Sequence, residues 1–169
     1  MQMDTGFTPS DGRPALNTSA DGRVASLARD GWRELGFWYE CDVERKCWNF
    51  RADRKGVNEF AAAVRRFLGA PESHEIGEHV HLGPYSNLRF VTAARPQAGW
   101  RGIEGRRADF EQLAAELEQL ARGAGEGSHA LGEGWASGDS YRLVLTVEED
   151  GFDPASPEGS VAATGSGAA

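Results

Sequence analysis

Apolar side chains recur at helical spacing in two stretches of the chain. The first stretch occupies positions 57, 60, 61, 64, 67 and 68, and the second occupies positions 110, 113, 114, 117, 120 and 121. Separations of three and four residues bring each set to one face of an α-helix. Gly69 and Pro71 follow the first stretch and end it. The pattern therefore predicts two amphipathic helices of similar length.

Short runs rich in aromatic and β-branched residues surround the two helices. We expect strands at residues 35–43, 47–52, 78–82, 87–92, 100–105 and 141–147. The Gly-rich stretch 122–139 is expected to be a loop. Cys41 and Cys47 flank the tip of the first predicted hairpin. A disulfide between them is geometrically possible, but a reducing compartment favours two free thiols.

The second half of this pattern repeats the first. A shift of 53 positions aligns the helical stripes without a gap, with Val57 on Phe110 and Val64 on Leu117. This predicts a leading strand followed by two βαββ-like units, at about 45–93 and about 98–148. Two units that share one sheet would make an α+β two-layer sandwich, mainly antiparallel, with both helices on one face. The alternative is that two unrelated units share only their helical spacing.

Composition places one domain between two irregular ends. The chain has 169 residues, of which 40% are hydrophobic, enough for the core of one domain, expected at residues 34–149. Residues 1–33 mix Asp, Gly, Pro, Ser and Thr with isolated apolar residues, which predicts a flexible N-terminal segment. Residues 150–169 are rich in Gly, Ala, Ser and Pro, which predicts a disordered C-terminal tail whose first few residues can be tied down.

The same composition predicts a cytoplasmic protein. No run approaches the roughly 18 to 20 apolar residues that would span a bilayer, so no membrane partner is expected. The first ten residues have neither the basic region nor the apolar run of a secretory signal.

Charge is unevenly distributed and narrows the class of partner. The formal net charge of −8 lies in residues 100–169, because residues 1–99 contain 13 basic and 13 acidic side chains. A negative surface repels phosphate backbones, so nucleic acid is not an expected partner. It would attract a basic protein surface, although an acidic surface can also serve solubility alone. The candidate partner-binding carboxylates are Glu104, Asp109, Glu111, Glu116, Glu118, Glu126 and Glu133.

Five tryptophans form a second candidate surface. Trp38 and Tyr39 face opposite ways along a strand, so at least one is exposed unless both faces of the sheet are covered. Trp135 lies in the Gly-rich stretch beside Glu133 and is a predicted interface anchor. The alternative for Trp135 is a side chain that packs back over the helices.

Two histidines suggest a different chemistry. His79 and His81 alternate along a predicted strand and so point to the same face. They could hold Zn²⁺ if His129, His74 or a cysteine supplied a further ligand, giving a metal-binding protein or a metal-dependent enzyme. The alternative is a pair of solvated surface histidines. No other catalytic or cofactor-binding motif stands out, so we expect a non-enzymatic protein without a cofactor.

Several stretches resemble a known family. Residues 78–88 (EHVHLGPYSNL) and the later stretches 103–105, 110–120, 140–145 and 150–154 are similar to the immunity protein 32 family. The resemblance covers roughly residues 45–155. Members of that family are assigned to polymorphic-toxin systems as neutralisers of a cognate toxin. The resemblance implies a non-enzymatic cytoplasmic protein that binds and blocks a toxin, and it specifies neither the toxin nor the oligomeric state.

Overall fold

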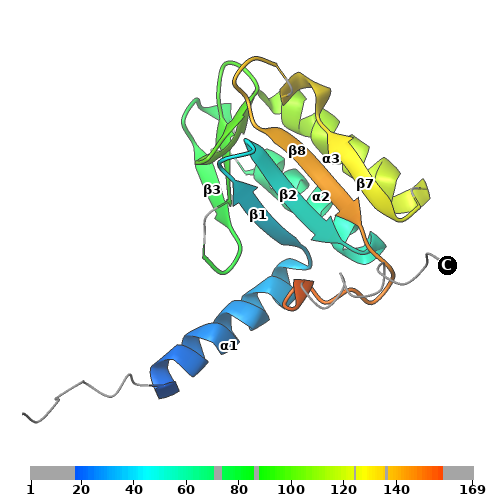
Figure 1. The fold of residues 1–169 in the computed structure, drawn as a ribbon. Coiled ribbons are helices and arrows are strands. Elements are labelled where there is room, and N and C mark those ends of the chain that lie inside the picture. Colours follow the sequence, from blue (N-terminus) through cyan, green and yellow to red (C-terminus); the bar gives the residue numbers. More distant parts are fainter. Residues whose placement is uncertain (1–17, 71–73, 86–87, 124, 136, 158–169) are drawn as a thin grey trace, which may run out of the picture.

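The computed structural model describes residues 18–70, 74–85, 88–123, 125–135 and 137–157 (Figure 1). These residues form an α+β fold, as predicted. In chain order its elements are α1 (Thr18–Leu35), β1 (Trp38–Asp42), β2 (Cys47–Ala52), α2 (Arg54–Gly69), β3 (His79–Leu82), β4 (Leu88–Thr92), β5 (Gln97–Gly99), β6 (Gly102–Gly105), α3 (Arg107–Gly123), β7 (Gly127–Leu131), the 3₁₀ turn η2 (Glu133–Trp135) and β8 (Arg142–Val147). None of the helices in the described part of the chain is long and apolar enough to cross a membrane.

The strands form two four-stranded sheets, so the expectation of one shared sheet is wrong. The strand orders are β1-β2-β8-β7 and β3-β4-β6-β5. In each sheet the central pair is parallel and the two outer pairs are antiparallel. Each sheet therefore combines one hairpin from the first half of the chain with one hairpin from the second half.

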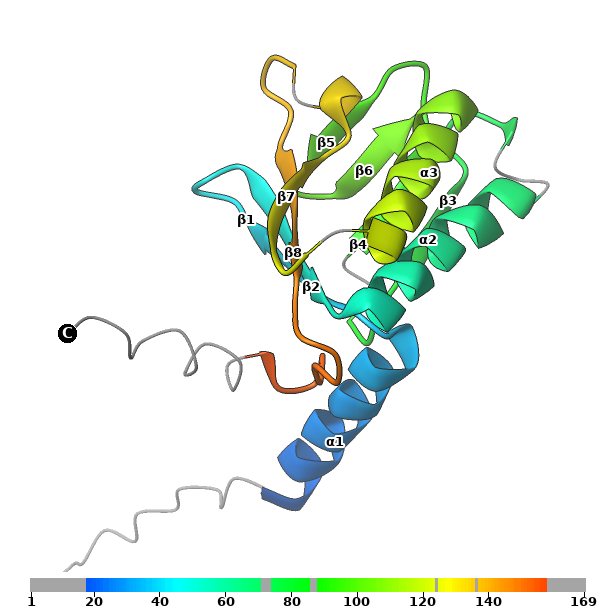
Figure 2. The ribbon, with the colours of Figure 1, turned by 90° about the vertical axis from the view of Figure 1, so that its right-hand side faces the viewer.

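Helices α2 and α3 form the other layer, which packs against both sheets (Figure 2). Phe60 on α2 packs against Phe50 of the first sheet at 4.7 Å between ring centroids and against Phe90 of the second sheet at 6.4 Å. Helix α2 also buries Gly56 and Ala63, which lie beyond the predicted apolar stripe. A single flat sheet contacts a helix along only one narrow stripe, so burial of a face of this width requires neighbouring elements on more than one side of α2.

The two halves of the chain follow the same order of hairpin, helix and hairpin. Phe50 on β2 faces Leu145 on β8, and the corresponding Ile103 on β6 faces Phe90 on β4. The leading strand of the second half is β5, a three-residue strand that the sequence did not indicate. This shared order agrees with the predicted repeat, which stays a prediction.

Residues 18–35 form helix α1, whereas the sequence predicted an irregular, flexible segment over residues 1–33. Trp32 and Leu35, in the last turn of α1, pack against the core, whereas Val24 and Leu27 are exposed. The helix projects away from the sheets in both views (Figures 1 and 2). Its apolar positions are sparse because only its last turns contact the domain. Residues 1–17 lie outside the described residues.

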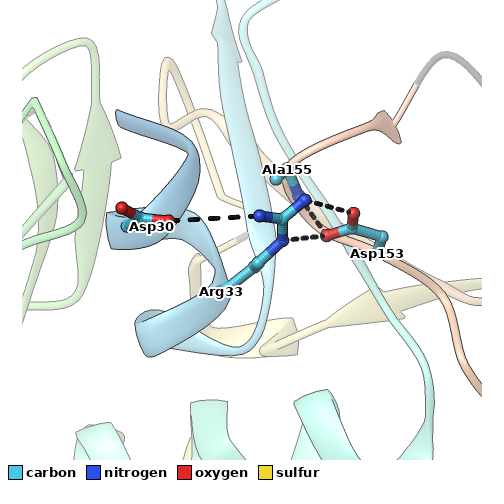
Figure 3. Close-up of polar contacts among 4 residues, drawn as sticks. All are labelled: Asp30, Arg33, Asp153 and Ala155. Atoms are coloured by element: carbon cyan, nitrogen blue, oxygen red, sulfur yellow. Dashed lines mark hydrogen bonds and ion pairs between the residues drawn. The ribbon is translucent and has the colours of Figure 1, made fainter. Parts of the chain in front are cut away.

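The first residues of the predicted disordered tail are held by two arginines. Arg33 on α1 binds Asp153 through two hydrogen bonds, of 3.2 and 3.0 Å (Figure 3). Arg51 on β2 binds Glu148 at 2.6 Å and donates to the carbonyl oxygen of Pro157 at 2.7 Å. Residues 150–157 therefore lie against the domain, and residues 158–169 lie outside the described residues.

The Gly-rich stretch 122–139 is not only a loop. Residues 127–131 form β7, the edge strand beside β8. Its sequence, GSHAL, has four of five positions without a large apolar side chain, and only Leu131 is buried. Pairing with β8 stabilises this strand in place of hydrophobic alternation.

Candidate functional site

Asp109, a predicted partner-binding carboxylate, has a structural role instead. It is 9% exposed and lies in the first turn of α3. One carboxylate oxygen accepts hydrogen bonds from the Arg106 backbone N–H at 2.8 Å and from the Arg106 guanidinium at 2.9 Å. These bonds hold the pKa of the Asp109 carboxyl below its usual value, against the opposing effect of its burial. Asp109 therefore stabilises the start of α3 and is not available to a partner.

Three more of the predicted carboxylates are engaged within the protein. Glu118 on α3 binds Arg65 on α2 through bonds of 2.9 and 3.1 Å, which lower the pKa of Glu118. Glu111 pairs with Arg107 one helical turn away. Glu116 accepts a hydrogen bond of 2.9 Å from the backbone N–H of Gly132. Arginines therefore offset the charges of Glu118 and Glu111, whereas Glu116 is held by a neutral donor and keeps its charge.

The remaining predicted acidic residues are dispersed. Glu104 is half-buried on β6, whereas Glu126 and Glu133 are exposed near the two ends of β7. Trp135 is 2% exposed, donates from its indole nitrogen to the Glu104 carbonyl oxygen at 2.7 Å, and packs edge-on against Phe110. Trp135 is therefore not an exposed interface anchor; the alternative prediction, in which its side chain packs back over the helices, agrees with the structure.

The structure does not bring the predicted metal ligands together. His79 and His81 lie on the exposed face of β3, with 5.1 Å between their ring centroids. His129 lies on β7 in the other sheet. Across the described residues, no three His, Cys, Asp or Glu side chains are grouped so that they could hold a metal ion.

A cleft of about 790 Å³ opens where β1 and β2 of the first sheet approach β4 and the β5–β6 turn of the second. That volume is typical of sites for small ligands or for anchoring side chains. We call it the aromatic cleft. It is lined by Trp32, Trp38, Tyr39, Glu40, Cys41, Val43, Trp48, Tyr85, Arg89, Trp100 and Arg101.

Two hydrogen-bonded aromatic side chains hold the walls of the cleft together. The Trp48 indole nitrogen donates to the carbonyl oxygen of Gly99 at 2.8 Å. The Tyr39 hydroxyl donates to the Leu82 carbonyl oxygen at 2.6 Å and accepts from the Leu88 N–H at 3.3 Å. Each of these bonds joins one sheet to the other, so the two sheets are fixed relative to each other at the cleft.

Aromatic rings pack edge to face along one wall. Trp32, from α1, lies 4.8 Å from Tyr39 and 6.4 Å from Tyr85 between ring centroids. Tyr39 in turn lies 5.9 Å from Trp48. Packing of this kind limits side-chain motion and so preorganises the surface. At the rim, by contrast, Trp100 is 61% exposed and Tyr85 is 57% exposed.

The cleft has a positive side. The Arg89 guanidinium takes part in no ion pair with the described residues, and its buried Nε has no hydrogen-bond partner among them. The Arg101 guanidinium lies over the Trp100 ring, 4.7 Å from the ring centroid. Glu40, which is exposed, supplies the opposing charge.

Cys41 in the cleft is not an activated nucleophile. Burial, with a smaller contribution from the neighbouring Asp42, raises the pKa of the thiol to about 11. At neutral pH the sulfur is therefore protonated, and only a thiolate attacks efficiently. Cys41 and Cys47 are both free thiols, the state that the sequence analysis favoured over a disulfide.

Sequence reasoning noted the tryptophans but did not locate the cleft. Its lining comes from five separate segments, and the close approach of the two sheets is what unites them. The available signal was the density of aromatic residues at 32–48 together with Trp100. Comparison of the chain with family models, with curated proteins and with solved structures found no match.

Proposed function

We propose that this chain is a non-enzymatic binding protein that captures a protein partner at the aromatic cleft. The partner that we propose is a toxin of a polymorphic-toxin system, as the resemblance to immunity proteins implies. The observation that carries the proposal is the exposure of Trp100 and Tyr85 at the mouth of a preorganised aromatic surface.

The composition of the cleft supports a protein interface. Tryptophan, tyrosine and arginine are the side chains that contribute most to binding energy at protein interfaces. The aromatic cleft contains six Trp or Tyr side chains and two Arg side chains. Exposed aromatic rings at a rim are costly in water, and a partner that covers them recovers that free energy.

The acidic residues support the proposal less well than the cleft does. Asp109, Glu111, Glu116 and Glu118 are engaged within the molecule. Glu126 and Glu133 are exposed and can still attract a basic partner at long range, which would increase the rate of association. We therefore assign the short-range contacts to the cleft and only this steering to the exposed carboxylates.

The test is a binding measurement with an inactive form of the toxin encoded beside the gene of this protein. The double variant Tyr85→Ala/Trp100→Ala removes two exposed rings and should leave the fold intact. We expect its dissociation constant to rise by about 30-fold or more, since a single anchor of this kind already contributes about 2 kcal/mol. The matched control is Ile76→Ala, which removes an exposed apolar side chain outside the cleft.

A second pair of substitutions tests the acidic surface. Charge reversal at Glu126 and Glu133 should slow association and leave the dissociation rate nearly unchanged. If these reversals abolish binding while the Tyr85/Trp100 variant binds normally, the cleft is not the interface.

A further inference from the structure

We infer that the aromatic cleft selects an acidic, aromatic segment of the partner: an aromatic side chain with a carboxylate beside it. This inference rests on the proposed function and gives the chemistry of the group that enters the cleft. The predicted attraction to a basic partner concerns its overall surface, whereas the segment in contact with the cleft has the opposite charge.

The first observation is that Arg89 and Arg101 form no ion pair with a carboxylate of the described residues. Arg33, Arg51, Arg65 and Arg106 each bind a carboxylate of this chain at 2.6–3.0 Å. Among the described residues, Arg89 has no such partner, and its Nε is both buried and without a hydrogen-bond acceptor. A buried guanidinium nitrogen without an acceptor destabilises the protein unless something else compensates. A carboxylate brought by a partner would supply that acceptor once the Arg89 side chain turned toward the cleft.

The Arg89 side chain can reach such a carboxylate because it lines the cleft. Its Nε is covered by protein atoms, so binding of a carboxylate at this nitrogen requires the side chain to turn toward the cleft. The Arg89 guanidinium forms no ion pair with the described residues that would hold it in its present position. The planar guanidinium also matches a carboxylate with two parallel hydrogen bonds.

The second observation is the position of Arg101 at the rim. Its guanidinium lies over Trp100, 4.7 Å from the ring centroid. This contact holds a cation beside an exposed aromatic surface, so an incoming group meets an indole and a positive charge together. Arg101 itself is exposed, which leaves its other donors available.

Charge within the cleft favours an anion over a cation. The described lining residues include two arginines and one carboxylate, that of Glu40. Aromatic walls alone would also suit an ammonium group. The two arginines oppose that choice, because like charges in a partly buried cleft repel each other. The aromatic walls then take the flat apolar part of the ligand, and the arginines take its carboxylate.

The test uses the full chain, labelled with ¹⁵N, and three small probes of matched shape. N-acetyl-phenylalaninate carries the ring and a carboxylate, N-acetyl-phenylalanine amide carries the ring alone, and phenethylammonium carries the ring with a positive charge. We expect the acid to bind about tenfold or more tightly than the amide, and phenethylammonium to bind most weakly. The indole N–H signals of the cleft tryptophans should shift on binding.

Arginine variants assign the preference to the cleft. Arg89→Gln and Arg101→Gln should each reduce the preference for the acid over the amide by about tenfold. Arg101 lies in an exposed turn, so its variant tests the inference even if Arg89→Gln fails to fold. The matched control is Arg122→Gln on α3, an exposed arginine outside the cleft, which should leave the preference unchanged. Equal binding of acid and amide, tighter binding of phenethylammonium, or a preference that survives both cleft substitutions overturns the inference.

Partner capture separates the two proposals. If the toxin is captured through Trp100 but the probes show no preference for the acid, the inference fails and the proposed function stands. If the acid is preferred but the toxin is not captured, the proposed function fails and the chemistry of the cleft stands.

Discussion

The indole nitrogen of Trp48 donates a hydrogen bond to the carbonyl oxygen of Gly99, 2.8 Å away and 51 residues along the chain. Trp48 belongs to the first sheet and Gly99 to the second. The same indole lines the aromatic cleft. One contact therefore fixes the two sheets relative to each other and shapes the candidate site.

Replacement of Trp48 by phenylalanine tests this contact. The variant loses the indole N–H and leaves the Gly99 carbonyl oxygen without that donor, so we expect the free energy of unfolding to fall by about 1–3 kcal/mol. Urea unfolding followed by circular dichroism measures the change. Trp100→Phe is the matched control, because this exposed side chain should change stability by no more than about 0.5 kcal/mol. Equal effects of the two substitutions would show that the contact does not stabilise the fold.

Gly102 on β6 should not tolerate a side chain. Its φ is +140°, and an added Cβ would meet the backbone carbonyl of Arg89 on the adjacent strand. We expect Gly102→Ala to lower the free energy of unfolding by about 1–3 kcal/mol and to displace Arg89 from the cleft. Gly99→Ala is the control, since open space surrounds that position. Thermal unfolding gives the melting temperature of each variant. Equal melting temperatures for Gly102→Ala and Gly99→Ala would contradict this account.

Sequence patterns predicted the elements whose signals are local. Strand β2 and the apolar stripes of α2 and α3 were located correctly, because regular spacing of apolar residues reports directly on one buried face. Helix α1 was missed because Val24 and Leu27 face water and only its end packs on the domain. Strand β7 was missed because it is an edge strand of small residues.

The sequence patterns did not predict which strands pair when they lie far apart in the chain. The division into two sheets depends on which hairpin meets which, for example Phe50 with Leu145, and alternation along one strand does not specify its neighbour. The predicted partner-binding role of two residues was wrong for the same reason. Trp135 and Asp109 looked exposed in a polar stretch, yet tertiary contacts bury both of them.

Stability should decrease at acid pH through carboxylates that arginines hold ionised. Hydrogen bonds from Arg106, Arg65 and Arg33 lower the pKa of Asp109, Glu118 and Asp153, respectively. Because these groups bind protons more weakly in the native state than in the unfolded state, their contribution is complete above their unfolded pKa values, of about 4. It is lost as the pH falls through the lower native values.

Asp109→Asn isolates one of these carboxyl groups. The variant should be less stable than the wild type at pH 7, and its stability should change less between pH 6 and the acid limit of folding. Urea midpoints across that pH range measure both effects. Asp139→Asn serves as the control, because its side chain is 98% exposed and its ion pair with Lys46 lies at the surface, so the substitution should change the urea midpoints little. A profile for Asp109→Asn that parallels the wild type would contradict the role assigned to this carboxylate.

The cysteines should react slowly in the native protein. Burial raises the pKa of Cys41 to about 11 and also raises the pKa of Cys47. We expect labelling by a thiol reagent at pH 7 to be far slower than in urea, and the native rate to increase as the pH rises toward 11. Native and unfolded rates that are equal at pH 7 would show that neither thiol is protected.

The central claim is that a partner binds at the aromatic cleft, and the indole N–H signals of the five tryptophans test it most directly. Four tryptophans line the cleft: Trp48 is buried and bound to the Gly99 carbonyl oxygen, and the three accessible ones are Trp32, Trp38 and Trp100. Trp135 is buried against Phe110 beside α3. The test is a titration of a ¹⁵N-labelled sample with inactive toxin. We predict that the signals of the three accessible cleft tryptophans shift or broaden while that of Trp135 stays in place. A bound complex in which these three signals do not change would contradict the account.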